Sequence, residues 1–312
     1  MLRIMIMIAG ALLVVAGAAF WWLFLSGSKA PASAPGVMDV AGWRALIAQD
    51  AGQGPERIGW LEVAHDNFPA FVVQAGRFDG PVEMSFNSVE LAWPYQTILI
   101  DTAVDAEIMA GMAQTKNAQF DAAAYEAMLD AMSRAGQIII THEHIDHVIG
   151  IARHPDPAGI APRLSVTGTQ RDALSPYAIG GALPDEIRFA QTLDLSAPTR
   201  IAPGVVIAPM SGHSPGSQVI FVQRADGAEY LFIGDIAWTM RNIEELTTRP
   251  VALNYMIFDP PEVRDNVRAQ LRALHDLMAT DPALTIVPAH DRPYLLGLVA
   301  DGRLVAGFAP KL

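Results

Sequence analysis

The feature that most constrains this chain is the heptapeptide Thr141–His147, which contains three histidines and one aspartate. It lies between two apolar runs, of which the first predicts a short buried strand and the second can open a helix. Because alternate residues of an extended segment point to the same side, His142 and His144 are expected to face one position. Asp146 and His147 fall on the following turn and face a second position. The spacing therefore predicts two adjacent metal sites at the end of a strand.

Three further candidate ligands follow strand-like runs later in the chain. They are His213, Asp235 and His290, and each comes directly after an apolar run or within a few residues of it. Five of the chain's eight histidines then belong to one set with two aspartates. Polar turn residues that cap helices are the alternative explanation, but the recurrence of such residues at four strand ends favours a metal centre.

The composition limits the chemistry of such a centre. The chain of 312 residues has no cysteine, so every metal ligand must be a nitrogen or an oxygen. Charged residues make up 17% of the chain and hydrophobic residues 51%, which is typical of a folded protein with a sizeable core. The net charge of -12 and the lack of Lys and Arg clusters argue against nucleic acid as a partner.

The N-terminal segment predicts an association with a membrane. Residues 4–25 contain no charged side chain and are long enough to cross a bilayer as a helix. Phe20, Trp21 and Trp22 lie near the end of this run, where interfacial aromatic residues gather. A retained anchor is favoured over a cleaved signal peptide, because the apolar region of a secretory signal is shorter than this run. Secretion after cleavage is the alternative.

The charges that flank this segment predict its orientation. Arg3 and the terminal amine precede the span and Lys29 follows it, a slight bias that places the N-terminus in the cytoplasm. We therefore expect a single-pass protein of the cytoplasmic (inner) membrane whose domain faces the periplasm. The predicted organisation is an anchor or signal segment at 1–27, a Pro/Ala/Ser linker at 28–40 and one domain at 41–312.

The domain is expected to alternate strands and helices in an α/β layered fold. Apolar runs separated by Gly and Pro predict strands at 70–75, 82–91, 97–100, 137–140, 163–166, 205–208, 218–222, 230–233 and 284–287. Composition and apolar spacing predict helices at 43–47, 105–112, 122–134 and 261–280. The segment 177–183 is interpreted as a mobile cover over a site.

The order of these motifs resembles the metallo-β-lactamase fold superfamily of metallo-hydrolases, over roughly residues 60–300. The resemblance implies a four-layer αββα sandwich with a dinuclear metal site on one edge. The donors suit two Zn²⁺ ions, with Fe, Mn or Co as alternatives. Carried over to this chain, the first metal would be held by His142, His144 and His213, and the second by Asp146, His147 and His290. Asp235 would bridge the two metals, and Asp101 would orient a ligand imidazole.

The downstream pattern resembles the N-acyl-homoserine lactonase-like branch of the superfamily. It comprises the segments 234–238, 241–244, 258–260 and 289–291. The β-lactamases that use a cysteine ligand are excluded, and those without one usually lack the bridging carboxylate that Asp235 would supply. The branch often has a tyrosine three residues after this aspartate, where it contacts the substrate carbonyl. This chain has Trp238 there, whose indole N–H can donate a hydrogen bond but cannot lose a proton as a phenol can.

The resemblance implies a hydrolase that opens a lactone or a related small-molecule ester with a metal-bridging hydroxide. Asp146 would be a proton shuttle as well as a ligand, and Trp238 would contact the substrate or pack beside the site. Alternatives on the same dinuclear site are a thioesterase of the glyoxalase II type, a β-lactamase and a phosphodiesterase. An alternative of another class is a non-catalytic periplasmic binding module.

Several other residues are expected to have structural roles. His65 and His154 are assigned to solvated surface turns rather than to a metal site. Met84 and Phe86 are assigned to the core, where large apolar side chains usually lie, and the lining of an apolar pocket is the alternative. Gly212 and Gly216 are expected to serve the backbone geometry around His213.

Overall fold

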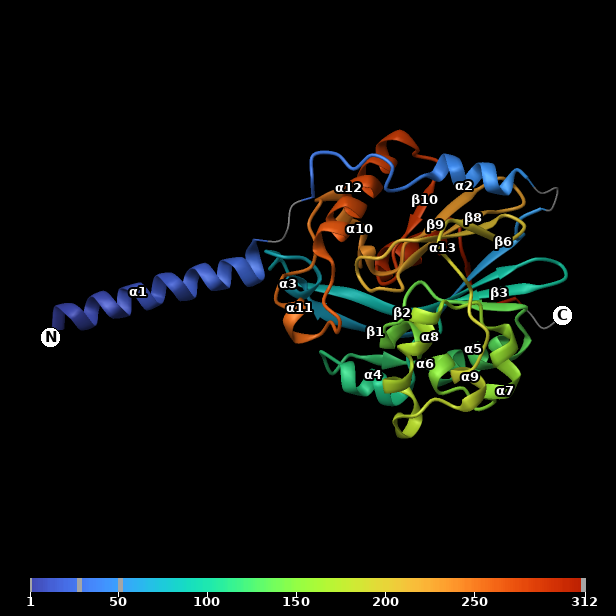
Figure 1. Cartoon of the computed structure of the whole chain (residues 1–312), viewed down its shortest axis with the longest axis horizontal. Helices are drawn as coiled ribbons and strands as arrows, with labels where there is room; N and C mark the ends of the chain where they lie inside the picture. The colour runs from blue at the N-terminus through green and yellow to red at the C-terminus, as the bar shows by residue number, and fades with distance from the viewer. Residues whose placement is uncertain (1, 27–29, 50–52, 310–312) are drawn as a thin grey trace.

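The computed structural model describes residues 2–26, 30–49 and 53–309, and two β-sheets pack face to face at its centre (Figure 1). Helices cover the outer face of each sheet. Between the sheets lies a buried apolar core whose members include Ile58, Ile98, Ile207, Ile220 and Phe232. This arrangement is the αββα sandwich that the family resemblance implied.

The first sheet has the strand order β11–β1–β2–β3–β5, and β4 pairs with β1. Its strands are β1 (Arg57–Pro69), β2 (Pro81–Ala92), β3 (Thr97–Ile100), β4 (Gln119–Phe120), β5 (Gln137–Ile139) and β11 (Val305–Ala306). Strands β3 and β5 run parallel, and their register pairs Ile100 with Ile139. The segments that follow these two strands therefore leave the sheet at the same edge.

The second sheet has the strand order β10–β9–β8–β7–β6. Its strands are β6 (Thr199–Ala202), β7 (Val205–Pro209), β8 (Gln218–Gln223), β9 (Glu229–Phe232) and β10 (Thr285–Val287). Strands β9 and β10 are parallel, with Phe232 paired to Val287. Their carboxyl ends also lie together, which sets the positions of the loops that carry Asp235 and His290.

Four helices supply most of the outer layers. On the first sheet lie α5 (Ala122–Arg134) and α6 (Ile145–Ala152), and on the second lie α2 (Val40–Ile47) and α12 (Arg264–Thr280). Helix α12 buries Val267, Leu271 and Leu274, which recur every three or four residues along one face. Asp121 caps the N-terminus of helix α5, because its side chain accepts a hydrogen bond from the backbone N–H of Ala124.

Short helices and helical turns complete the fold. The α-helices are α3 (Ala70–Val73), α4 (Ala106–Met112), α7 (Pro157–Ile160), α8 (Gly168–Asp172), α9 (Asp185–Arg188), α10 (Met240–Glu244), α11 (Leu253–Met256) and α13 (Arg292–Ala300). The 3₁₀ turns are η2 (Ala161–Arg163), η3 (Ser175–Tyr177), η4 (Ile179–Gly181) and η5 (Gly234–Ile236).

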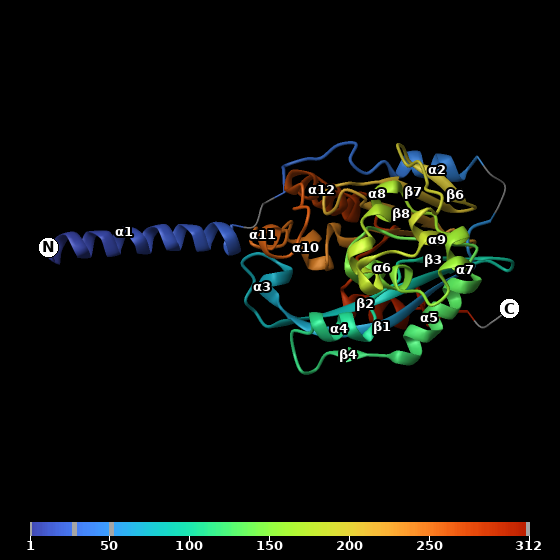
Figure 2. The same cartoon turned by 60° about the horizontal axis from the view of Figure 1, so that its bottom comes forward.

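The N-terminal segment is a long helix that projects from the domain (Figures 1 and 2). Helix α1 (Leu2–Phe20) continues into a π-helical turn, η1 (Trp21–Leu25). Among the described residues, this is the one helix long and apolar enough to cross a membrane, a property that membrane anchors and signal sequences share. The predicted boundary between segment 1–27 and linker 28–40 lies outside the described residues.

Two predicted strands are wrong, and one predicted helix begins later than expected. The run 70–75 is not a strand, because Pro69 ends β1 and the chain turns into the short helix α3. The run 163–166 forms no strand and contributes a single bridge, between Leu164 and Ile138. Helix α12 begins at Arg264 instead of residue 261. The residues before it place the buried side chain of Glu262 near the candidate site.

The longest strand, β1, was not predicted. Its pairing with β2 is interrupted by an irregularity between Glu62 and Ala64, which breaks the alternation that a sequence pattern relies on. His65, expected in a surface turn, lies in this strand, and its Nδ1 is 2.8 Å from Glu62 Oε1. His154, expected in solvent, is buried, and its ring lies 3.2 Å from the carbonyl of Leu129.

Candidate metal centre

Four of the predicted ligands come from the loop after β5 and the first turn of α6. His142 and His144 lie in the loop, and Asp146 and His147 lie in the helical turn that begins at Ile145. The backbone N–H of His147 donates to the carbonyl of His144, so the turn holds the loop and the helix at fixed spacing. The loop and the turn present their side chains to two neighbouring positions, as the heptapeptide spacing predicted.

The other three come from three separate strand ends. His213 lies between β7 and β8, Asp235 lies in the turn after β9, and His290 follows β10. All three are at least 96% buried. The parallel pairing of β9 with β10 brings Asp235 and His290 to the same edge, opposite the loop after β5.

The first group of potential ligand atoms contains His142, His144, His213 and Asp235. His144 Nδ1 lies 2.8 Å from His213 Nε2, and His213 Nε2 lies 3.3 Å from Asp235 Oδ2. His142 Nε2 is 3.7 Å from the same carboxylate oxygen. These atoms therefore surround one position next to Oδ2 of Asp235.

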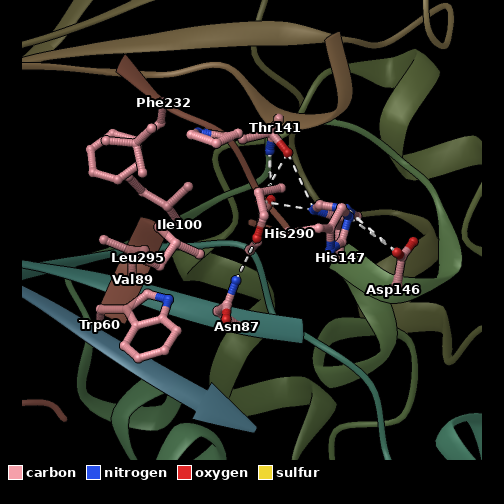
Figure 3. Close-up of a pocket in the computed structure, with 15 residues that line it drawn as sticks. Trp60, Asn87, Val89, Ile100, Thr141, Asp146, His147, Phe232, His290 and Leu295 are labelled. Carbon is pink, nitrogen blue, oxygen red and sulfur yellow. Dashed lines mark hydrogen bonds and ion pairs between the residues drawn. The ribbon is translucent and has the colours of Figure 1, made fainter. Parts of the chain in front are cut away.

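The second group contains Asp146, His147, Asp235 and His290. His147 Nε2 and His290 Nε2 lie 3.3 Å apart, at 3.4 and 3.0 Å from Asp235 Oδ1. Asp146 Oδ2 is 3.4 Å from His290 Nε2. Figure 3 shows both rings directed to the same region as the Asp146 carboxylate. Because the two groups use different oxygens of Asp235, this carboxylate joins them.

The donors fit two divalent cations. His142 Nε2 and Asp235 Oδ1 are buried polar atoms without a hydrogen-bond partner among the described residues, which is costly unless a ligand satisfies them. Each group gathers imidazole nitrogens and carboxylate oxygens whose atoms lie within 4.8 Å of one another. Such sets without thiolate suit Zn²⁺, and Fe, Mn and Co as well.

The ligand imidazoles divide into two classes. Burial of His147 and His290 is outweighed by the carboxylates around them, which raise the pKa of both rings above the usual value, whereas the pKa of two other rings is lowered. Burial lowers the pKa of His142 well below its usual value, and it does the same for His144. Both imidazoles are therefore neutral at pH 7, as a metal ligand must be. Burial alone would raise the pKa of Asp235, but the charge on the neighbouring imidazoles, that of His290 first, outweighs it and holds that pKa well below the ordinary range.

Hydrogen bonds behind the rings fix which nitrogen faces the centre. His147 Nδ1 lies 2.9 Å from Asp101 Oδ2, and the backbone N–H and the hydroxyl of Thr141 also donate to Asp101. His290 Nδ1 donates to the carbonyl of Ser85 at 2.8 Å. Each contact directs the Nε2 atom of the ring inward. The parallel register of β3 and β5 places Asp101 for this role, which the sequence had anticipated.

Comparison with known families agrees with this geometry. The family model for the metallo-beta-lactamase superfamily matches residues 96–290, which is more than half of the chain. The chain belongs to the metallo-beta-lactamase superfamily. A comparison with the sequences of curated proteins finds no match.

Solved structures share the fold of this chain at low sequence identity. An N-acyl homoserine lactone hydrolase with N-hexanoyl-L-homoserine at its metal centre is similar with a TM-score of 0.58 at 14% identity, covering 78% of this chain and 96% of its own. A B. thuringiensis AiiA mutant with N-decanoyl-L-homoserine at its active site gives the same values. A probable metal-dependent hydrolase from Staphylococcus aureus has a TM-score of 0.55 at 12% identity, covering 77% and 91%.

In this member of the superfamily, His213 is held by an acidic residue that the sequence analysis missed. His213 Nδ1 lies 2.8 Å from Glu262 Oε1, and the guanidinium of Arg249 donates to the same oxygen, with its Nε at 3.1 Å. Burial would raise the pKa of Glu262, but Arg249 and His213 outweigh it and hold this pKa at about 2. In the sequence, Glu262 is visible only as an acidic residue between a Pro-Pro pair and a long helix. Nothing in that pattern indicates a contact with His213.

Glu143, the remaining polar residue of the heptapeptide, faces away from the ligand groups. Its carboxylate accepts hydrogen bonds from the hydroxyl of Ser214 at 2.8 Å and from the backbone N–H of Gly216 at 2.9 Å. A Cβ atom at Gly216 would lie 2.5 Å from a carboxylate oxygen of Glu143. Gly216 therefore allows the two loops to approach each other closely. This role is more specific than the predicted one, which concerned only the backbone geometry.

A cavity of about 470 Å³ opens beside both ligand groups. Its polar end includes His144, Asp146 and Asp235, and most of its remaining wall is apolar or aromatic. Trp238 lines it, and the indole N–H donates to Asp235 Oδ2 at 2.6 Å. Tyr177, from the segment predicted to cover the site, also lines it. Met84 and Phe86 are buried as predicted and form part of the same wall.

Proposed function

We propose that this protein is a dinuclear, zinc-dependent hydrolase that opens lactones or related esters. The observation that carries the proposal is the pair of ligand groups that share Asp235 beside a largely apolar cavity. The structural neighbours that bind N-acyl-L-homoserine products support the choice of a lactone. When bound, two metal ions would supply an activated water and polarise the substrate oxygen.

The residues around the cavity have separate tasks in such a reaction. The oxygen of water adds to the acyl carbon, the acyl C–O bond breaks, and the departing alkoxide takes up a proton to give a hydroxy acid. Asp146 belongs to the second ligand group and also lines the cavity, so its carboxylate is placed to move that proton. Trp238 holds one oxygen of Asp235 through its indole N–H, which restricts the orientation of the shared carboxylate.

The proposal is tested with a substrate panel on metal-loaded protein of measured zinc content. The panel contains an acyl-homoserine lactone, a simple γ-lactone, an aryl ester, a thioester, a β-lactam and a phosphodiester. We expect ring opening of at least one lactone to be the fastest reaction. Failure to open any lactone would contradict the substrate assignment, and turnover of another member would instead indicate a thioesterase, a β-lactamase or a phosphodiesterase. Bound metal without any turnover would favour a binding module.

Tyr177 is expected to donate a hydrogen bond to the substrate. Burial and the nearby carboxylates of Asp146 and Glu143 raise the pKa of this phenol, so it keeps its proton at pH 7. Tyr177→Phe should lower kcat about tenfold to a hundredfold and leave zinc content unchanged, because only a transition-state hydrogen bond is removed. Tyr125→Phe, at another half-buried tyrosine outside the cavity, is the matched control. Equal kcat values for the two variants would contradict this role.

We also propose that the N-terminal helix is retained as an anchor in the cytoplasmic membrane and that the domain faces the periplasm. Contacts between the end of this helix and the domain support retention, since the backbone N–H of Gly76 donates to the carbonyl of Phe24 at 2.9 Å. Protease added to spheroplasts should degrade the domain. Full protection would contradict the orientation.

A further inference from the structure

Large apolar side chains are exposed where the N-terminal helix meets the domain. Phe78, Tyr255, Met256 and Ile257 are between 61% and 73% exposed, and we call these four residues the apolar rim. They lie in or next to α11 and in the segment after α3. Figures 1 and 2 show both helices at the base of α1. Exposed apolar side chains gathered in one region of the surface usually mark an interaction surface.

The end of the N-terminal helix is fixed against this part of the domain. The backbone N–H of Ala252, at the start of α11, donates to the carbonyl of Leu23 at 3.0 Å. The ring of Trp22 lies 6.1 Å from that of Tyr255, which belongs to the apolar rim. If α1 crosses a bilayer, the rim is therefore held at the membrane surface, where aromatic side chains are stable.

The same helix end forms part of the cavity wall. Phe24 lines the cavity together with Met256 and Ile257 of the apolar rim. The polar end of this cavity is formed by His144, Asp146 and Asp235. One continuous apolar space thus connects the exposed rim and the last turn of the N-terminal helix with both ligand groups.

We infer that the apolar rim binds the membrane surface and that the substrate is a membrane-resident amphiphile with a long acyl chain. Its chain enters the cavity from the bilayer between η1 and α11, and its ester or lactone group reaches the ligand groups. The inference rests on the proposed hydrolase function. The bilayer is the favoured occupant of the rim because Phe24 belongs both to the apolar helix and to the cavity wall.

The first test compares a water-soluble substrate with a membrane-embedded one. Full-length protein in phospholipid vesicles receives either γ-butyrolactone or a γ-lactone with a twelve-carbon side chain. Phe78 and Tyr255 belong to the rim but do not line the cavity, so Phe78→Glu and Tyr255→Glu leave the site intact. We expect the double variant to lower kcat/KM for the long-chain lactone at least tenfold and to leave the short one within twofold.

The matched control is Phe189→Glu. Phe189 is 70% exposed, as is Tyr255, but it follows α9, which lies away from α1 in Figures 1 and 2. This variant should alter neither rate. Equal rates of the rim variants and the wild type on the embedded lactone would overturn the inference. Turnover of neither lactone by the wild type would instead contradict the proposed function.

A second test does not depend on turnover. A sixteen-carbon fatty acid with a mid-chain diazirine is placed in the vesicles, and the products of irradiation are mapped. We expect cross-links in the cavity segments 68–72 and 253–258 in addition to α1. Cross-links confined to α1 would overturn the membrane route. Labelling of the cavity without hydrolysis of any ester would support the route and contradict the hydrolase assignment.

Discussion

Replacing Asp235 by asparagine should lower the metal content from two ions per chain to at most one and reduce kcat at least about a thousandfold. The two oxygens of Asp235 face different ligand groups, at 3.3 Å from His213 Nε2 and 3.0 Å from His290 Nε2. An amide keeps the shape of the side chain but replaces one of these oxygens with a nitrogen that carries two protons. One ligand group therefore loses its shared donor.

The metal content and the rate are measured on the same preparation, by mass spectrometry of the metals and with the best substrate of the panel. Asp265→Asn, at an exposed position of α12, is the matched control and should change neither value. Two metal ions together with a wild-type rate in the Asp235 variant would contradict the bridging role. Alanine at His142 or at His290 should each reduce metal content and abolish activity.

The candidate ligands could be located from the sequence because each of them lies in a segment that follows a strand and its local pattern is visible in the sequence. The pairing of Phe232 with Val287 then brings distant loops to one edge, and that pairing is a regular property of parallel strands. Local sequence was sufficient for these residues. It was insufficient for β1, whose irregularity near Glu62 hides the strand pattern.

The parts of the site that were not predicted from the sequence depend mainly on contacts between segments that are distant in sequence. The cavity wall combines Phe24 with Met84 and Phe258, and no local pattern relates these three residues. The contact between Trp238 and Asp235 is local, at a spacing of three residues, but its geometry depends on the turn that η5 forms. The contact between Glu262 and His213 also depends on the tertiary structure. It forms because α12 begins later than its apolar pattern suggests.

Replacing Glu262 by glutamine should destabilise the fold by about 3–5 kcal/mol and weaken zinc binding about tenfold to a hundredfold. Glu262 and Arg249 are both almost fully buried, so the variant leaves a guanidinium without its counter-charge in the interior. It also removes the carboxylate that orients His213. Chemical denaturation measures the first effect, and zinc titration with a competing chelator measures the second.

A double variant separates these two effects. Arg249→Met combined with Glu262→Gln removes both buried charges, so we expect it to recover much of the lost unfolding free energy. Zinc affinity should stay low, because His213 still lacks its carboxylate partner. Recovery of zinc affinity together with stability would contradict the orienting role of Glu262.

The pH dependence of stability provides an independent measure of the same ion pair. The pKa of Glu262 is about 2 in the folded protein, against an ordinary value of 4.5. A carboxyl whose pKa is lowered by folding stabilises the fold fully above the unfolded pKa and loses that contribution as the pH falls toward the folded pKa. The difference in unfolding free energy between the wild type and Glu262→Gln should therefore be constant above about pH 5 and shrink steadily between 4.5 and about 2. A difference that does not change across this window would show that Glu262 acts through its shape and not through its charge.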